Sequence, residues 1–386
     1  MGSNPAGIPY WRLSAFYFFY YALLGGLAPY WSVYLREQGF GATEIGQIMA
    51  ILMLTRLLAP NFWGWLGDVG QCRLAMVRIG SFLAMVCFTG FFWAEGYWGY
   101  VLFMAAFSFF WTAVLPQFEV ITLHALGEQR PRYSQIRVWG SIGFILTVVG
   151  LGALFETASV DWLPLCLALL LASIWMASMV SLREPAQERS SVSHEGLLKV
   201  LRQRPVIAFL IVNFLLQLSH GPYYTFYSLY LQSAGYGLDQ IGWLWSLGVV
   251  AEVVLFLVMH RLLAGYSLAW IITASMILTA VRWFLIPVFV ESIWLLALIQ
   301  ILHAFSFGAM HAASIEFVHR YFSGRHQGQG QALYSSIGFG AGGTAGAFLS
   351  GYLYDFGGGP ITFALAGVAA AVAVPFAAQW LQEKRG

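Results

Sequence analysis

Apolar stretches long enough to cross a lipid bilayer recur along almost the whole sequence. One membrane-spanning helix needs about 20 predominantly apolar residues, and this chain of 386 residues is 59% hydrophobic and only 9% charged. Because soluble domains carry about 25% charged residues, a soluble protein is excluded. We predict an all-α integral membrane protein with twelve transmembrane helices. Their expected ranges are 9–36, 44–66, 74–94, 98–126, 134–156, 160–182, 205–233, 239–263, 268–289, 292–320, 328–354 and 359–382.

One long polar stretch, residues 183–204, divides these spans into two sets of six. We therefore predict an N-terminal six-helix bundle over residues 1–182, a linker over 183–204 and a C-terminal six-helix bundle over 205–386. The first apolar run is too long for the hydrophobic region of a signal peptide, and no small-residue cleavage site follows it. It is interpreted as the first span.

The distribution of arginine and lysine predicts the orientation of the chain. Basic residues gather in cytoplasmic loops of membrane proteins. If both termini are cytoplasmic, fifteen of the 19 basic residues fall on that side and only Arg36 falls outside. The other three, Arg56, Arg137 and Arg282, lie within predicted spans. The linker is therefore also expected to be cytoplasmic.

The two halves of the chain resemble each other. YWSVYLREQGFGATEIG at residues 30–46 aligns with FYSLYLQSAGYGLDQIG at residues 226–242, with seven identical positions at an offset of 196. The tetrapeptide SIGF, at residues 141–144, recurs at residues 336–339. A duplicated set of spans is typical of transporters whose halves move about a central site.

Several motifs resemble a known family of transporters. GWLGDVGQCR, residues 64–73, is similar to the loop signature of the major facilitator superfamily at Gly64, Leu66 and Asp68, although Val69 departs from it. Three further stretches, RLLAPNFWGWLGD, QIRVWGSIGF and LHAFSFGAMHAASIEF with the following GQALYSSIGFGAGGTAGAFLSGYLYD, resemble the branch that contains bacterial 3-phenylpropionate transporters and is itself similar to lactose permease.

This resemblance implies a major facilitator fold in the bacterial inner membrane. It also implies a functional monomer in the lipid bilayer that binds a small-molecule substrate and protons. Gly64 and Asp68 would belong to a loop gate.

Five charged residues are expected at the depth of a helix centre: Arg56, Glu119, Arg137, Glu252 and Arg282. Each costs about 3 kcal/mol at the centre of a membrane helix. We therefore expect them to face one another or a hydrated cavity. Arg56 and Glu252 differ by the repeat offset of 196. They would occupy equivalent places with opposite charge, and we predict an inter-bundle pair.

The resemblance implies roles for the other charges. In lactose permease, an acid and an arginine on the fourth and fifth helices hold the sugar, and Glu119 and Arg137 stand at matching places. They are the predicted substrate-binding charges. Lactose permease also couples protons through an arginine on the ninth helix and a histidine and a glutamate on the tenth. Arg282, His303 and His311 match the arginine and the histidine.

The proton carrier itself is less closely matched, because Ser306 stands near the expected position of the second acid. Glu252 is the preferred carrier, since a poorly solvated carboxyl group favours its protonated form. His303 or His311 remain alternatives, because imidazole titrates near neutral pH. A static ion pair at Glu252 and simple packing of the histidines are the alternatives without a role in transport.

Aromatic side chains complete the predicted substrate site. Tyr30 on the first span and Tyr227 on the seventh are expected to line the cavity, as is Trp139, which neighbours Arg137. Aromatic faces and hydroxyl groups suit an aromatic ring or a sugar. Interfacial anchoring and lipid-facing packing are the alternatives for such residues.

Other classes of function lack their motifs. No P-loop is present, and the only lysines are Lys199 and Lys384, so transport would use ion gradients. The scattered basic residues predict no nucleic-acid binding. The three cysteines lack metal or disulfide spacing, and we expect no cofactor and no catalytic or metal site.

We therefore expect proton-coupled uptake of a small organic solute, such as the aromatic acid 3-phenylpropionate. The alternatives are a sugar symporter of the lactose type and an exporter of drugs or sugars. An enzyme of membrane lipids would need catalytic residues at one membrane interface, and a receptor would need a soluble output domain.

Overall fold

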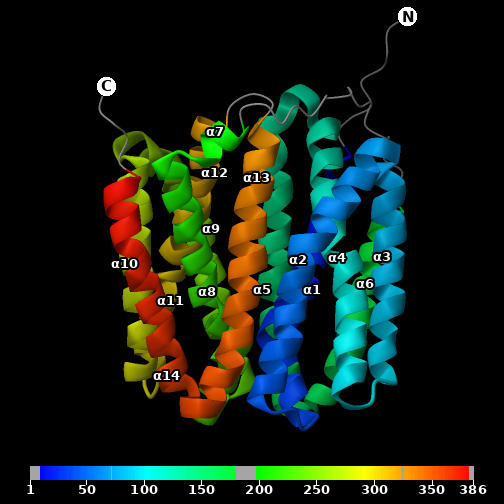
Figure 1. The fold of residues 1–386 in the computed structure, drawn as a ribbon. Coiled ribbons are helices and arrows are strands. Elements are labelled where there is room, and N and C mark those ends of the chain that lie inside the picture. The colour runs from blue at the N-terminus through cyan, green and yellow to red at the C-terminus, as the bar shows by residue number, and fades with distance from the viewer. Residues whose placement is uncertain (1–8, 71, 180–196, 323–325, 382–386) are drawn as a thin grey trace, which may run out of the picture. The chain divides into compact units, whose positions relative to one another are not determined.

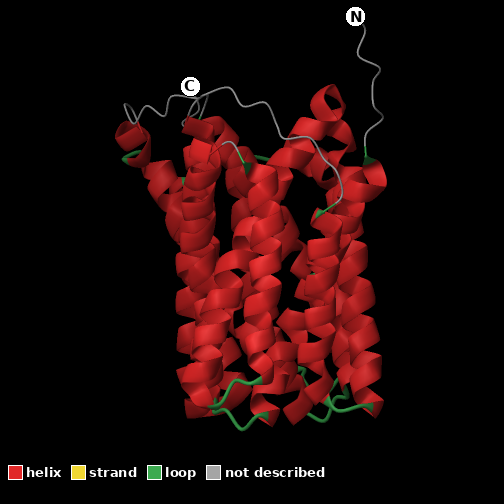
Figure 2. Ribbon diagram, turned by 90° about the vertical axis from the view of Figure 1, so that its right-hand side faces the viewer, coloured by secondary structure: helices red, strands yellow, loops and turns green. Residues whose placement is uncertain are grey.

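The computed structural model describes residues 9–70, 72–179, 197–322 and 326–381, which are nearly all helical (Figure 1). Short loops join the helices, and the described residues form no strand (Figure 2). The predicted all-α fold is confirmed. The helices of the first half are α1 (Tyr10–Glu37), α2 (Ala42–Gly70), α3 (Arg73–Thr89), α4 (Gly96–Leu126), α5 (Tyr133–Thr157) and α6 (Leu163–Ser178), with short turns η1 (Gly90–Phe92), η2 (Gly127–Arg132) and η3 (Val160–Trp162).

The second half begins with the short helix α7 and contains two π-helical segments, η4 and η6. Its elements are α7 (Leu197–Leu201), α8 (Arg204–Ser233), α9 (Leu238–Gly265), α10 (Leu268–Val288), α11 (Ile293–Ile301), η4 (Ala304–Ala309), α12 (Met310–Tyr321), α13 (Gln327–Ser335), η6 (Ser336–Gly342) and α14 (Gly343–Trp380).

The helix lengths agree with twelve membrane spans. Ten helical stretches of the described residues are long and apolar enough to cross a membrane. One of them, Gln327–Gln379, has 53 residues and bends at Gly357 and Gly358, so it is long enough for two spans. The 28-residue helix α1 is a further span. Together they account for the twelve predicted transmembrane helices.

Two compact units make up the chain. The first contains Met1–Leu27, Ala59–Thr147 and Trp162–Glu188, and the second contains Ala28–Leu58, Val148–Asp161 and Arg189–Gly386. Helices α1, α2 and α5 each contribute residues to both units. The two bundles predicted for residues 1–182 and 205–386 stay a prediction. Of the predicted linker, residues 183–196 lie outside the described part, and residues 197–201 form α7.

Glycines allow α1 and α5 to pack closely in the first unit. A side chain on Gly143 would meet the backbone of Phe18, and a Cβ atom on Gly25 would lie 2.6 Å from the carbonyl oxygen of Phe144. Real Cβ atoms do not approach other atoms so closely, so both positions require glycine. Gly143 and Phe144 belong to the first SIGF motif, whose role is therefore helix packing.

The second unit repeats this arrangement. A side chain on Gly221 would meet the backbone of Gly346, and a Cβ atom on Gly342 would lie 2.5 Å from the carbonyl oxygen of Phe214. Phe214 and Gly221 follow Phe18 and Gly25 by 196 residues. Small residues let membrane helices approach closely, and the internal repeat preserves these contacts in both halves of the sequence. Helix α8 therefore lies against η6 and α14 (Figure 1).

Within the second unit, the N-terminal end of α2 packs against α14. A Cβ atom on Gly46 would lie 2.7 Å from the Cα atom of Gly351, so the two backbones are in direct contact. The Asp355 carboxylate accepts a hydrogen bond of 2.9 Å from the Thr43 backbone amide and another from the Thr43 hydroxyl. A carboxylate at this position satisfies free backbone N–H groups and interacts favourably with the helix dipole.

The N-terminal end of α9 has a similar partner. The Glu156 carboxylate, at the end of α5, accepts a hydrogen bond of 3.0 Å from the Leu238 backbone amide. Nearby, the Tyr30 hydroxyl donates a hydrogen bond of 2.6 Å to the Val148 carbonyl. Helices α2 and α9 begin at equivalent places in the sequence repeat, and each has an acidic side chain from the opposite half of the sequence at its first turn.

Candidate functional site

The most buried charge among the described residues is Arg282 of α10, whose exposed fraction is 0%. Its guanidinium donates hydrogen bonds from Nη2 to Gln300 Oε1 at 2.8 Å and from Nη1 to Ser306 Oγ at 3.1 Å. Nη1 also lies 3.1 Å from His303 Nδ1. A buried charge is tolerable only with such partners. We call Arg282, Gln300, His303 and Ser306 the Arg282 site.

Aromatic rings enclose this site. The Arg282 guanidinium carbon lies 4.3 Å from the centre of the Tyr223 ring and 4.4 Å from that of Trp283. Such cation–π contacts are strongest where water is excluded. On the far side, the amide group of Gln300 donates to the hydroxyl of Tyr227. Tyr227 and Tyr223 are both fully buried, so α8 contributes the aromatic wall.

The contact with Arg282 determines where neutral His303 carries its proton. A guanidinium can only donate hydrogen bonds, so Nδ1 of His303 must accept, and the proton is then on Nε2. That nitrogen lies 3.9 Å from Oε2 of Glu252 in α9. The Glu252 side chain is 18% exposed. An arginine, a histidine and a carboxylate therefore follow one another across three helices.

The π-helical segment η4 begins directly after His303 and contains Ser306. A π-helix has a wider turn than an α-helix, and such segments are frequent at functional sites. The rings of His303 and Phe307 stack at 5.6 Å, and those of Phe307 and His311 at 6.1 Å. His311 is thus two turns away from the Arg282 site, and its Nδ1 lies 3.0 Å from the Tyr334 hydroxyl.

A second group of polar residues lies in the first unit. Tyr133 of α5 donates a hydrogen bond of 3.1 Å to Oε1 of Glu119 in α4. One turn later on α5, the Arg137 guanidinium lies 3.8 Å above the ring of Tyr21 and 5.9 Å from that of Tyr17. We call Glu119, Tyr133, Arg137, Tyr17 and Tyr21 the Arg137 site.

Arg137 and Glu119 are both half-buried and within electrostatic range of each other. Among the described residues, no hydrogen bond leaves the Arg137 guanidinium. Gly140 leaves room for it, because a Cβ atom there would lie 2.8 Å from Arg137 Nη1 and 2.7 Å from the Tyr21 ring. The donors of Arg137 can therefore meet an anion without breaking an internal hydrogen bond.

Trp139 and Tyr30 make their hydrogen bonds to residues outside these two sites. The Trp139 indole donates a hydrogen bond of 3.0 Å to Tyr10 and packs on Trp11, at the start of α1. The hydroxyl of Tyr30 is held by the Val148 carbonyl, as described above. Their predicted contribution to substrate binding stays a prediction.

The remaining predicted residues lie on α2. Arg56 is half-buried and, like Glu252, within electrostatic range of Tyr224 on α8. Their predicted pairing stays a prediction. A Cβ atom added to Gly64 would lie 3.8 Å from the amide nitrogen of Gln117. Asp68 falls in the last turn of α2, but its side chain lies outside the described part.

Gln300 and Tyr133 are polar partners that the sequence did not single out. Gln300 is a polar residue in the apolar run IWLLALIQI, one turn before His303. Tyr133 precedes Arg137 by one turn of α5. A search for polar residues one turn away from each intramembrane charge would have identified both.

Comparisons with known proteins agree with this architecture. Residues 10–365 match the MFS_1 like family. The chain is 28% identical over 367 residues to a probable 3-phenylpropionic acid transporter of Escherichia coli (strain K12), covering 92% of this chain and 93% of the relative. It is 26% identical over 351 residues to the maltose permease of Geobacillus stearothermophilus, covering 88% of this chain and 86% of the relative.

The fold is similar to that of a solved transporter. A crystal structure of a mutant of the nucleoside transporter NupG superposes with a TM-score of 0.82 and 17% sequence identity, covering 95% of this chain and 97% of the NupG chain. This similarity confirms the predicted major facilitator fold of twelve helices. The chain therefore belongs to the MFS_1 like family and is a multi-pass membrane transporter for a small molecule, not an enzyme.

Proposed function

We propose that this transporter couples the inward movement of protons to uptake of a small organic anion, an aromatic acid such as 3-phenylpropionate. It would act as a monomer in a bacterial inner membrane, with both termini in the cytoplasm. The observation that carries the proposal is the sequence of contacts from Arg282 through His303 to Glu252. The relative from Escherichia coli supports the substrate class.

Glu252 is the proposed proton carrier. A proton on Nδ1 of His303 would break the 3.1 Å contact with Arg282 and place two cations side by side, which argues against His303 as the carrier. Glu252 is partly exposed and can exchange a proton with water. When Glu252 loses its proton, its negative charge lies next to the Nε2–H group of His303, and Arg282 stabilises that charge through the imidazole.

Arg137 is the proposed anchor for the substrate carboxylate. A guanidinium binds a carboxylate through two parallel hydrogen bonds, and Tyr21 already supports its flat face. Glu119 would orient Arg137 through its negative charge. Tyr133 would hold the Glu119 carboxylate in place through its hydroxyl group. Tyr30, Tyr227 and Trp139 would contribute aromatic surface.

Further predicted roles concern coupling and gating. His311 would assist proton transfer, Arg56 would interact with Glu252 between the bundles, and Gly64 and Asp68 would form a loop gate. These roles follow from the family resemblance and from the placement of the residues in the sequence.

A sugar is the second candidate substrate. Glu119, Tyr133 and Arg137 together offer the acceptors and donors that hydroxyl groups need, and the maltose permease relative supports this reading. Export of a drug or sugar, the third candidate, predicts lower solute inside energised vesicles or cells. Competition between phenylpropionate and galactosides or maltose distinguishes the first two candidates.

The decisive experiment is uptake into proteoliposomes with an imposed pH gradient, acid outside. We expect accumulation of the aromatic acid, which collapses when the gradient is abolished. Glu252→Gln should lose accumulation but keep exchange of labelled for unlabelled substrate. Glu316→Gln is the matched control, because Glu316 forms an exposed pair with Arg320 at 2.8 Å. Undiminished accumulation by Glu252→Gln would reject Glu252 as the carrier.

A further inference from the structure

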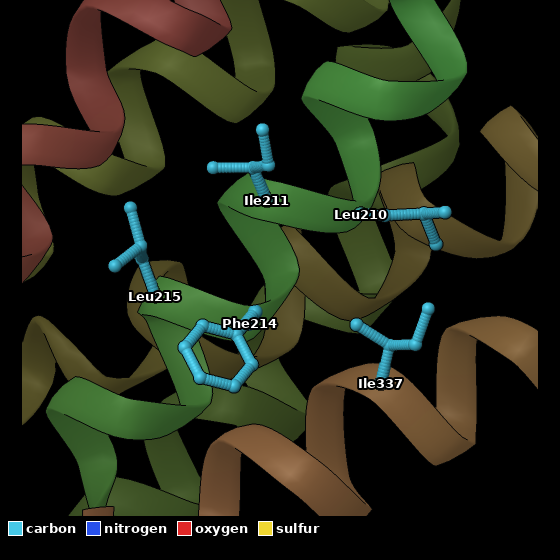
Figure 3. A pocket seen from close by; sticks show the side chains of 5 residues that line it. All are labelled: Leu210, Ile211, Phe214, Leu215 and Ile337. Carbon is cyan, nitrogen blue, oxygen red and sulfur yellow. The ribbon is translucent and has the colours of Figure 1, made fainter. Parts of the chain in front are cut away.

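An apolar groove lies between α8 and η6 in the second unit. It has a volume of about 250 Å³ and is lined by Leu210, Ile211, Phe214 and Leu215 of α8 and Ile337 of η6. Figure 3 shows these five side chains around the gap between the two helices. None of them carries a polar atom, so the groove offers no partner for water or for a polar solute.

The helix that forms the floor of the groove begins with a basic residue on the same face. In an α-helix, residues seven and eleven positions apart return to nearly the same side. Arg204 is the first residue of α8, so it shares a face with Ile211 and Leu215. At 1.5 Å per residue these lie about 10 and 16 Å from it along the axis. Ile207, between them, is 40% exposed, so this face of α8 is open within the second unit.

Two further basic residues precede α8. Lys199 and Arg202 are exposed, as is Arg204. Among the described residues, these three side chains have no acidic partner and no hydrogen bond. Three exposed positive charges without a partner among the described residues therefore lie at or just before the start of α8, at the membrane surface that the arginine and lysine distribution predicts to be cytoplasmic.

We propose that the groove is a binding site for one anionic phospholipid. An acyl chain would occupy the space between α8 and η6, and Arg204, Arg202 and Lys199 would bind the phosphate. Basic residues next to membrane helices attract anionic head groups. The distance of about 10 to 16 Å from Arg204 to the groove suits a lipid whose head group stays at the membrane surface. A neutral lipid would bring no net negative charge to these three side chains.

Native mass spectrometry of the purified full chain tests this proposal. The protein is titrated with phosphatidylglycerol and, separately, with phosphatidylcholine of the same acyl chains. We expect tighter retention of the first bound phosphatidylglycerol. Each basic side chain contributes about fivefold, so a variant with both Arg202→Ala and Arg204→Ala should lose about 25-fold of the preference. Arg261→Ala, at an exposed arginine on α9, should retain it.

A second variant tests the groove itself. Ile211→Trp fills the space for the acyl chain and should weaken binding of both lipids. Leu257→Trp is the matched control, since Leu257 is 71% exposed on α9. Glycerol phosphate, which has the head group but no acyl chains, should not compete. Both Trp variants are used only if their thermal unfolding matches that of the parent chain. If Ile211→Trp does not, it is replaced by Ile211→Ser, which keeps the space of the groove but makes it polar.

Three results would overturn the proposal. The first is equal retention of phosphatidylglycerol and phosphatidylcholine by the parent chain. The second is an unchanged preference when Arg202 and Arg204 are both replaced, or an equal loss with Arg261→Ala. The third is competition by glycerol phosphate, which would indicate a site for soluble phosphates.

Discussion

The Arg282 and Arg137 sites place an intramembrane arginine in contrasting surroundings. Arg282 is fully buried, and its Nη atoms already contact Gln300, Ser306 and His303. Arg137 is half-buried, with Tyr21 at 3.8 Å from its guanidinium and no hydrogen bond to another described residue. The first arginine has little capacity left for a ligand, whereas the second has donors available.

The difference indicates two roles for an intramembrane arginine: one holds neighbouring side chains in place, and the other can bind an anion. An arginine whose two terminal nitrogens are already occupied fixes the protonation and position of its neighbours, as Arg282 does for His303. An unsaturated arginine can bind and release an anion at low cost. The comparison predicts that mutations at Arg282 act first on stability, and that mutations at Arg137 act first on substrate affinity.

The largest expected effect is that of Arg282→Met on stability. It removes the donor to Gln300 Oε1 and to Ser306 Oγ inside a fully buried site. Leaving such buried groups without partners costs about 3 kcal/mol or more. Thermal unfolding in detergent should show a large drop in midpoint, while Arg137→Met should change the free energy of unfolding by less than about 1 kcal/mol. Equal losses for the two variants would contradict the comparison.

Substrate affinity should respond in the opposite order. Arg137→Met removes a charged hydrogen-bond donor worth about 1.5–3 kcal/mol, or about ten- to a hundredfold in affinity. The concentration dependence of exchange in proteoliposomes measures it. Arg137→Lys keeps the charge but loses the flat stacking on Tyr21, so it should restore only part of the affinity. Unchanged affinity in Arg137→Met would remove this residue from the substrate site.

A matched pair of tyrosines sharpens the comparison. Tyr227→Phe leaves the buried amide of Gln300 without its acceptor, which costs about 1–3 kcal/mol. Tyr133→Phe removes a hydrogen bond to the half-buried Glu119, where water can substitute, and should cost about 0.5–1 kcal/mol. Denaturation of the two purified variants in parallel provides the measurement. A larger loss for Tyr133→Phe would mean that the Arg137 site is the more tightly packed of the two.

The smallest effect is expected away from both sites, at the exposed end of α2. Asp355→Asn removes a negative charge from the helix N-terminus but keeps an oxygen that can accept from Thr43. The loss should be about 0.3–1 kcal/mol, and it should shrink at high salt because an exposed charge is screened. Unfolding midpoints at low and high salt test this expectation. A loss that does not depend on salt would indicate packing instead of charge.

Much of the fold could be predicted from the sequence because the membrane imposes it. Span length, the repeat at an offset of 196 and the single long polar stretch at residues 183–204 can all be read from the order of residues in the sequence. The grouping of Arg282 with His303 follows from the family resemblance, and the structure places the two side chains in contact.

Other features could not be predicted because they depend on helix phase or on distant residues. Ser306 lies in the π-helical turn η4, which changes which side of the helix each residue faces, so Ser306 could not be assigned to Arg282 from an ideal helix. Glu156 and Asp355 bind helix ends that are 82 and 312 residues away. Tyr30 and Trp139 have the right chemistry for a cavity, but hydrogen-bond partners elsewhere in the chain determine where their polar atoms lie.

The backbone contact between Gly46 and Gly351 provides a simple means of controlling the conformation of the second unit. The backbones of α2 and α14 meet here without intervening side chains. One methyl group at either position would therefore push the two helices apart. Gly46→Ala would force the start of α2 away from α14 without altering any charge or polar group. Such a variant would hold the start of α2 and α14 further apart, and its transport activity would show whether transport needs this backbone contact.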